Sequence, residues 1–154
     1  MIIAEAMLGL GDKAGEIFRM INPIEHSRTK EASNKYRVEP YVIAADVYGA
    51  GNLAGRGGWT WYTGSSSWYY KTGIEYLLGL KIEDGYLKIE PCIPKDWKEY
   101  QMQYRWKESI YNIKVLNPEG KNTGITRVIL NGEEVENNIK LDGKRSVYNV
   151  EIVI

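Results

Sequence analysis

Residues 56–68 read RGGWTWYTGSSSW, and in this stretch a glycine-rich loop gives way to a helix. The Thr-Gly-Ser run is typical of a helix start, where hydroxyl groups satisfy free backbone N–H groups. Such N–H groups, together with the positive end of the helix dipole, also suit an anion such as phosphate. Aromatic rings in the same stretch suit the apolar faces of sugars. Sugar and phosphate together suggest carbohydrate phosphorolysis, and the alternative is a buried aromatic cluster with an ordinary helix cap.

The candidate phosphate-binding residues are Thr63, Gly64 and Ser65. Thr63 would direct its hydroxyl at the anion, and Gly64 would let the backbone approach closely. Arg56 would add a charge-assisted hydrogen bond to the same anion, or would pair with a local carboxylate instead. No lysine follows the run, so the Walker pattern is absent, and a plain helix N-cap is the alternative role.

The candidate sugar-stacking residues are aromatic: Trp59, Trp61, Tyr62 and Trp68. In an extended segment Trp59 and Trp61 point to opposite sides, so at least one of them is expected in the core. Glu39 and Asp46 are the carboxylates of the loop region. A glycosidase needs two carboxylates beside the scissile bond, so this pair allows a hydrolase interpretation, the alternative being hydrogen-bonded loop acids. His26 is a candidate general base or an ordinary surface histidine.

The composition excludes several kinds of partner and site. The 154 residues carry 20 basic and 20 acidic side chains, which gives no reason to expect nucleic acid or a membrane as partner. One cysteine excludes an internal disulfide, and one cysteine with one histidine excludes a Cys- or His-rich metal site. No apolar run reaches spanning length and no secretion signal opens the chain, so we expect a cytoplasmic protein.

The residue pattern predicts an α+β protein whose helices come first. Helices are expected over residues 1–8, over 13–21 with Asp12 as cap, and over 63–80. The last of these should bury one face made by Tyr70, Ile74, Leu77 and Leu78, and its Gly73 indicates close packing. Residues 22–62 lack a periodic pattern and are predicted to form an ordered binding loop.

After Gly79 the apolar period changes from helical to two. Asp-Gly and Asn-Gly turns predict hairpins over 81–89 and 127–135. Alternating residues predict strands over 102–106 and 111–115, joined by a turn near Glu108, and a final strand over 147–154. This half is therefore predicted as an antiparallel β-sandwich, which divides the chain into domains 1–80 and 81–154.

Several motifs then occur in a characteristic order: NPIEH at 22–26, VEPYV at 38–42, ADVY at 45–48, GRGGWTWYTGS at 55–65, GL at 79–80, IEPCIP at 89–94 and DW at 96–97. Over residues 1–116 this set resembles the C-terminal part of glycoside hydrolase family 94. That family contains cellobiose, chitobiose and cellodextrin phosphorylases, 1,2-β-oligoglucan phosphorylases and the C-terminal region of cyclic β-1,2-glucan synthases. The sequence of residues 44–48 and 56–62 is similar to that of the β-1,2-glucan branch of the family.

The resemblance implies that residues 1–80 are the end of an (α/α)6 barrel and that a jelly-roll-like antiparallel β-sandwich follows. It implies inverting phosphorolysis of a β-linked glucose oligosaccharide, in which a carboxylic acid protonates the glycosidic oxygen while inorganic phosphate attacks the anomeric carbon. The product is α-glucose 1-phosphate, with no cofactor and no metal. Thr63 and Gly64 match the family's phosphate-binding pair. The candidate substrate-binding residues are Glu39, Tyr41, Asp46, Arg56, Trp59 and Trp61.

The chain also departs from the family. Family members are far longer, and their general acid and their phosphate-binding His and Arg lie upstream of the matched segment, so His26 is not that histidine. We therefore expect no catalytic acid here, no activity from the chain alone, and either a missing barrel portion as partner or self-association through the first helices. The alternatives are a stand-alone carbohydrate-binding or structural β module, and an inverting hydrolase using Glu39 and Asp46.

Overall fold

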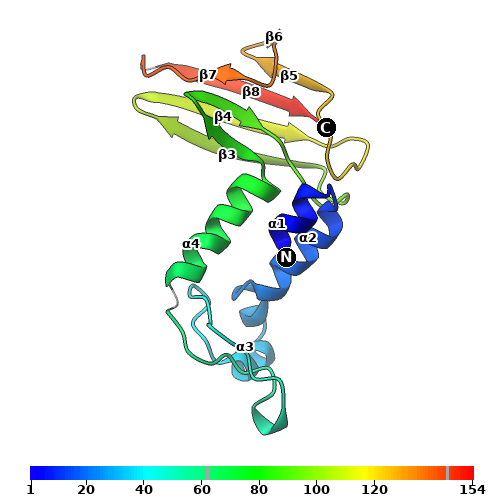
Figure 1. The fold of residues 1–154 in the computed structure, drawn as a ribbon, viewed down its shortest axis with the longest axis vertical. Helices are drawn as coiled ribbons and strands as arrows, with labels where there is room; N and C mark the ends of the chain where they lie inside the picture. The colour runs from blue at the N-terminus through cyan, green and yellow to red at the C-terminus, as the bar shows by residue number, and fades with distance from the viewer. Residues whose placement is uncertain (62, 145) are drawn as a thin grey trace. The chain divides into compact units, whose positions relative to one another are not determined.

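A computed structural model describes residues 1–61, 63–144 and 146–154. The chain divides into two compact units: unit 1 comprises Met1–Gly15 and Ile74–Ile154, and unit 2 comprises Glu16–Gly73. The protein is α+β, as predicted, with helices in the first half of the sequence and strands in the second (Figure 1). No helix within the described ranges is long and apolar enough to cross a membrane.

The strands of unit 1 form two sheets (Figure 1). The smaller sheet has the order β1-β2-β7, where β1 is Leu80–Glu83, β2 is Tyr86–Ile89 and β7 is Ile139–Lys140. The larger sheet has the order β3-β4-β8-β5-β6. Its strands are β3 (Glu99–Trp106), β4 (Ser109–Leu116), β5 (Arg127–Leu130), β6 (Glu133–Glu134) and β8 (Val147–Val153).

One hydrophobic core takes side chains from both sheets. Leu87 and Ile89 come from β2, Ile113 and Val115 from β4, and Ile152 from β8, and all five are buried in the same cluster. Along β4 every second side chain is buried, which matches the period of a strand. Burying such a side chain contributes about 1.5–3 kcal/mol, so a slip of one residue would expose the whole set. The alternating pattern therefore sets the register of these strands.

The predicted hairpin turns are confirmed. Asp84 and Gly85 have φ of +49° and +79°, and Asn131 and Gly132 have φ of +52° and +92°, which are the left-handed conformations of a type I′ turn. The turn between β3 and β4 lies at Lys107 and Glu108, one residue before its predicted position.

The prediction of a wholly antiparallel β half is wrong at one strand pair. β8 lies beside β4 and runs parallel to it, from Ile110 opposite Val147 to Leu116 opposite Val153. The segment between β4 and β8 is long and itself contains β5, β6 and β7. This length lets the chain return and insert β8 between β4 and β5, whereas a short turn would have produced an antiparallel neighbour.

The first helix forms where the sequence predicted it, as α1 (Ile2–Met7), and the second helix begins earlier than predicted. α2 spans Gly11–Ile21, so Asp12 lies in its first turn and is not its cap. Instead, Asp12 Oδ1 accepts a hydrogen bond of 2.9 Å from the Lys95 N–H, which lowers the pKa of the carboxyl group. Sequence pattern could not show this partner because it lies far along the chain.

Unit 2 contains a helix that the sequence analysis placed in a loop. α3 (Lys30–Tyr36) is capped by Thr29, whose Oγ1 accepts a hydrogen bond of 3.1 Å from the Ala32 N–H. Only Tyr36 is buried within this helix, so it has no apolar stripe to signal it. Two 3₁₀ turns, η1 (Glu25–Ser27) and η2 (Gly51–Leu53), lie in the same stretch.

The helix predicted over 63–80 begins at the expected residue but changes type. α4 spans Thr63–Lys71, and the π-helical segment η3 continues from Thr72 to Leu77. The predicted buried face is wrong at Tyr70, which is 71% exposed, whereas Leu77 is buried. A π-helical turn shifts the spacing of side chains away from the α-helical period, so the face does not continue through it. Gly73 packs closely as predicted, because a Cβ there would lie 3.2 Å from the Phe18 ring.

Gly79 offers a stability test with a matched control. Gly79 and Gly85 have nearly equal φ, +76° and +79°, but a Cβ at Gly79 would overlap the Glu90 carbonyl group, whereas one at Gly85 meets open space. Both alanine variants should lose about 1–2 kcal/mol for the left-handed backbone. Gly79→Ala should lose a further ~1–3 kcal/mol from the overlap, measured as free energy of unfolding in urea. Equal losses in the two variants would contradict the overlap at Gly79.

Asp142 makes the stability of unit 1 depend on pH. Its carboxylate accepts hydrogen bonds from Tyr148 Oη at 2.6 Å and Ser109 Oγ at 3.0 Å, and the first of these is the main reason that the Asp142 pKa is lowered. A lowered pKa in the folded state stabilises the fold above the unfolded pKa of about 3.9, and this stability is lost as pH falls through the folded value.

The stability difference between the wild type and Asp142→Asn should therefore shrink as pH falls through the acid range. Urea midpoints measured from pH 6 downward would show it, with Asp96→Asn, at an exposed position, as the control. A difference that stays constant with pH for Asp142→Asn would rule out this linkage.

Candidate functional site

Two of the motif segments pair with each other in unit 2. The Ala45 N–H donates to the Trp59 carbonyl at 2.7 Å, the Gly58 N–H donates to the Asp46 carbonyl at 2.9 Å, and the Tyr48 N–H donates to the Arg56 carbonyl at 2.9 Å. An antiparallel bridge joins Val47 and Gly57. Residues 45–48 and 55–59 therefore lie side by side and form one irregular ladder, which we call the motif ladder.

The glycines of the motif ladder are required by close approach. A Cβ at Gly57 would overlap the Val38 side chain, and the Gly57 N–H donates to the Tyr36 carbonyl at 2.9 Å. A Cβ at Gly58 would overlap the Asp46 carboxylate. Since any other residue adds this Cβ, the two glycines let residues 55–59 pack against Val38 and against the Asp46 side chain of the facing segment.

Asp46 has a structural partner. Its Oδ1 accepts a hydrogen bond of 3.3 Å from the Trp59 N–H, so this carboxylate holds the start of the aromatic segment. Glu39 is half-buried, and its carbonyl accepts from the Val42 N–H at 3.2 Å. Among the described residues no hydrogen bond joins the two side chains. The contacts therefore give Asp46 the role of a hydrogen-bonded loop acid, which removes support from the hydrolase interpretation.

The aromatic residues of the segment are at the surface. Trp59 is 76% exposed, Trp61 is 61% exposed and Tyr41 is 73% exposed. The expectation that Trp59 or Trp61 lies in the core is wrong, because Trp61 has φ of +62° and the segment is not extended there. Tyr41 and Trp61 meet edge to face, with ring centroids 6.1 Å apart. The site therefore offers exposed rings of the kind that stack on sugars; Tyr62 lies outside the described residues.

Trp68 extends the exposed aromatic set onto α4. It is 63% exposed, and the Lys71 ammonium lies 5.9 Å from its ring centroid, a cation–π distance. The left-handed conformation of Trp61 is uncommon for a bulky residue and costs about 1–3 kcal/mol. Such a cost at an exposed ring points to a functional reason for its placement.

The candidate phosphate-binding residues open α4. The helix begins at Thr63, its first turn contains no acidic residue, and Thr63 and Gly64 are exposed while Ser65 is half-buried. A Cβ at Gly64 would meet nothing within 4 Å, so there is open space beside the backbone. The first turn of a helix presents unpaired N–H groups and about half a unit of positive charge, which attract an anion.

The sequence suggested that Arg56 and Thr63 share one anion, but Arg56 lines a different part of unit 2. Arg56 lines a hollow of about 210 Å³ together with Lys35 and Arg37, and the lining of this hollow does not include Thr63, Gly64 or Ser65. The common anion proposed for Arg56 and Thr63 therefore has no support from the contacts of Arg56.

The remaining sequence candidates have structural partners. His26 Nε2–H donates to the Met20 carbonyl at 2.7 Å, and its ring stacks on Tyr36 with centroids 4.8 Å apart. Cys92 is buried, and burial raises the pKa of its thiol, which disfavours the reactive thiolate form. Within the described residues no group of three His, Cys, Asp or Glu side chains could hold a metal ion.

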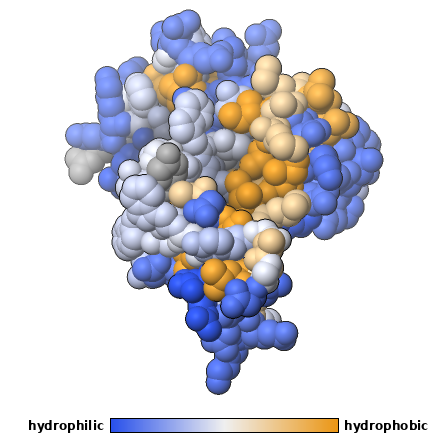
Figure 2. Space-filling model, turned by 60° about the horizontal axis from the view of Figure 1, so that its bottom comes forward, coloured by the Kyte–Doolittle hydropathy of each residue, from blue (hydrophilic) through white to orange (hydrophobic). Residues whose placement is uncertain are grey.

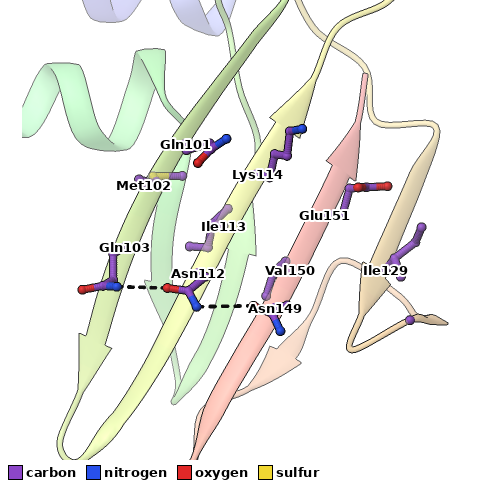
Figure 3. Close-up of a pocket in the computed structure, with 11 residues that line it drawn as sticks. Gln101, Met102, Gln103, Asn112, Ile113, Lys114, Ile129, Asn149, Val150 and Glu151 are labelled. Atoms are coloured by element: carbon purple, nitrogen blue, oxygen red, sulfur yellow. Dashed lines mark hydrogen bonds between the residues drawn. The ribbon is translucent and has the colours of Figure 1, made fainter.

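The sequence analysis missed a broad hollow of about 790 Å³ on the outer face of the larger sheet (Figure 3). Gln103 Nε2 donates to Asn112 Oδ1 at 3.0 Å, and Asn112 Nδ2 donates to Asn149 Oδ1 at 3.3 Å, so amides form a ladder across β3, β4 and β8. The sequence did contain a signal for this amide ladder, because polar residues alternate with the buried ones along these strands. The sequence did not show which strands become neighbours, so the ladder could not be predicted.

Comparison with known proteins finds a matching family for each half of the chain. Residues 1–79 match the family described as "Glycosyl hydrolase 94 superfamily, catalytic domain", and residues 80–147 match "Glycosyl hydrolase family 65, C-terminal domain". The chain is 44% identical over 115 residues to the cyclic beta-(1,2)-glucan synthase NdvB of Rhizobium meliloti (strain 1021), covering 75% of this chain and 4% of that protein.

Two further relatives are phosphorylases. The chain is 34% identical over 136 residues to an N,N'-diacetylchitobiose phosphorylase of Vibrio furnissii, covering 87% of this chain and 16% of that protein. It is 26% identical over 153 residues to a solabiose phosphorylase of Paenibacillus borealis, covering 98% of this chain and 20% of that protein. The chain thus spans at most a fifth of the length of these relatives.

The role of Gly58 in holding Trp59 can be measured. In Gly58→Ala the added Cβ should displace the Asp46 carboxylate and break its bond to the Trp59 N–H. A hydrogen bond to a charged group is worth about 1.5–3 kcal/mol, so the Trp59 amide should exchange with solvent roughly tenfold faster or more. Gly49→Ala is the matched control, because its Cβ meets nothing within 4 Å. Unchanged protection of Trp59 in Gly58→Ala would show that Asp46 does not hold this segment.

Proposed function

The chain belongs to the glycosyl hydrolase 94 superfamily, and on that premise we propose that it is the C-terminal part of an inverting β-glucan or β-glucoside phosphorylase. The observation that carries the proposal is the stretch from Trp59 to Ser65, in which the exposed Trp59 and Trp61 come a few residues before the start of α4 in the sequence. Rings for sugar and N–H groups for phosphate thereby occur within a few residues of each other. The 44% identity to a β-1,2-glucan synthase supports a β-linked glucan as the sugar.

The proposed reaction exchanges one bond for another at the anomeric carbon. An oxygen of inorganic phosphate attacks that carbon from the face opposite the leaving sugar, and the bond from carbon to glycosidic oxygen breaks. A carboxylic acid gives its proton to that oxygen, so the products are α-glucose 1-phosphate and a sugar shortened by one unit. Phosphate is a co-substrate, and the proposed chemistry needs no cofactor.

In this proposal the residues of this chain bind and position the phosphate and the sugar, and none of them acts as the general acid. Thr63, Gly64 and Ser65 hold the phosphate through a hydroxyl and backbone N–H groups. Tyr41, Trp59 and Trp61 form part of the sugar-binding wall, Asp46 holds Trp59 in place, and Glu39 and Arg56 stay lower-ranked substrate candidates. The acid is proposed to come from the rest of the catalytic domain. Because loss of a general acid removes about 10²–10⁴-fold of rate, the chain alone is expected to be inactive.

The proposal includes the architecture of the whole domain and the partner of this chain. The first helices would be the last helices of an (α/α)6 barrel, and the two sheets would form a jelly-roll-type sandwich. Met1, Met7, Leu8 and Leu10 are exposed apolar residues on or beside α1, and Figure 2 shows apolar residues reaching the surface. The remainder of the barrel, or a second copy of this chain, would cover them.

A second function rests on a different observation. The amide ladder of Gln103, Asn112 and Asn149 lines a broad hollow and could bind sugar hydroxyls, which would make unit 1 a carbohydrate-binding module without catalysis. The two functions differ in their dependence on phosphate. Sugar binding by this chain alone that ignores phosphate and is lost in Asn112→Ala would favour the binding module.

The phosphorylase proposal is tested by reconstitution. The chain is mixed with a polypeptide that supplies the rest of the catalytic domain, and release of glucose 1-phosphate from β-glucan is assayed against phosphate concentration. Thr63→Val keeps the shape of the side chain and removes one hydroxyl, so the phosphate requirement should rise about 10–100-fold, equivalent to a charged hydrogen bond of roughly 1.5–3 kcal/mol. The sugar requirement should change little.

Two variants control this experiment. Thr63→Ser restores the hydroxyl and should recover most of the phosphate affinity. Ser67→Ala removes a hydroxyl from an exposed position further along α4 and should leave both requirements unchanged. If Thr63→Val altered only the sugar requirement, Thr63 would be a helix cap and the phosphate assignment would be dropped.

A further inference from the structure

Three basic residues are among those that line a small hollow in unit 2. Lys35 and Arg37 come from the end of α3, and Arg56 comes from the segment after η2. Asn34 and Asn52 belong to the same lining. The volume of about 210 Å³ equals that of roughly seven water molecules at about 30 Å³ each, which is room for an oxyanion and some of its water.

The charge of this basic hollow is unbalanced. Its lining residues include two arginines and one lysine but no acidic residue. Among the described residues, no ion pair joins Lys35, Arg37 or Arg56 to an acidic side chain. Like charges gathered around one space repel each other, and an anion in that space would offset the repulsion. The residue set therefore fits a negatively charged ligand.

The Arg37 guanidinium is held in place before any ligand binds. Arg37 ends α3 in the left-handed conformation, with φ of +53°, and its backbone N–H donates to the Ser33 carbonyl at 2.9 Å. Its Nε–H donates to the Asn34 carbonyl at 2.9 Å, which leaves the two terminal nitrogens of the fork for another acceptor. A fork fixed in this way suits the paired oxygens of a phosphate or carboxylate.

The other two basic residues are held in place by close packing and by backbone hydrogen bonds. The aliphatic part of Lys35 lies so close to Gly55 that a Cβ there would overlap it, and Gly55 has φ of +87°. Arg56 is held by its N–H, which donates to the Leu53 carbonyl at 2.9 Å, and by its carbonyl, which accepts from the Tyr48 N–H at 2.9 Å. The motif ladder thereby brings Arg56 to the end of α3.

We propose that the basic hollow of Lys35, Arg37 and Arg56 is an oxyanion-binding subsite, separate from the start of α4. Its ligand carries a phosphate or a carboxylate group, as inorganic phosphate or as part of a charged sugar. The subsite does not depend on the function proposed for Thr63, because neither Thr63 nor its neighbours line it.

The test is a titration of the isotope-labelled full chain, followed by NMR of the backbone amides and the arginine Nε–H groups. The ligands are inorganic phosphate, glucuronate and neutral glucose, all at constant ionic strength so that general screening is not taken for binding. Saturable shifts at Arg37 and Arg56 are expected with phosphate, with glucuronate or with both, and none with glucose. Which of the two anions binds identifies the oxyanion chemistry.

Variants then assign the site. Arg37→Gln and Arg56→Gln should each weaken binding by about tenfold or more, since each removes charge-assisted hydrogen bonds. Lys30→Gln removes an exposed charge from α3 outside the hollow, and Thr63→Val alters the α4 site; both should leave the anion-induced shifts at Arg37 and Arg56 as they are in the wild type. Circular dichroism checks that every variant is folded.

Three results would overturn the proposal. The first is the absence of saturable shifts at both arginines with either anion. The second is equal weakening by Lys30→Gln, which would mean a diffuse charge effect. The third is loss of these shifts in Thr63→Val with retention in Arg56→Gln, which would assign the anion to α4. A failure of the Thr63 experiment above leaves this titration unaffected.

Discussion

The close approach of neighbouring side chains to the backbone at Gly57 and Gly58 is the constraint on which the candidate site depends. The apolar cluster beneath it is small, consisting of Tyr36, Val38 and Val42 with Ala44 against it. So little buried surface contributes only a few kcal/mol, and the shape of the segment must come from backbone hydrogen bonds. Those bonds form because two residues without a Cβ let residues 55–59 lie against Val38 and the Asp46 side chain. The exposed rings and Arg56 are held through this ladder.

Unit 1 is stabilised in a different way. Its two sheets share one core, and polar groups are satisfied by specific partners, as when Asn137 bonds both the N–H and the carbonyl of Ile89 at 3.0 Å. The candidate phosphate and sugar residues, in contrast, lie on exposed segments with few buried contacts. Binding residues are commonly carried on loops whose positions a rigid scaffold defines. Here the scaffold of the loops is the motif ladder.

Unit 2 has two distinct places that favour an anion. The α4 start offers backbone donors and no side-chain cation in its first turn, whereas the hollow at the end of α3 gathers three cations. The sequence analysis joined Arg56 to Thr63 because they lie close in the chain. The contacts place Arg56 with Lys35 and Arg37 instead, because the ladder turns the chain back toward α3.

The sequence by itself determined what depends on neighbouring residues. The Asp-Gly and Asn-Gly turns, the alternating strands and the start of α4 at Thr63 follow from local backbone preferences and side-chain period. The motifs also identified the family. Only the tertiary structure decided that β8 runs parallel to β4, that Asp12 binds the Lys95 N–H, and that Trp59 and Trp61 are both exposed. Each of these features depends on contacts between distant segments or on a backbone turn. A local sequence pattern cannot predict such pairings, because many partners could satisfy the same hydrogen-bond donors and apolar faces equally well.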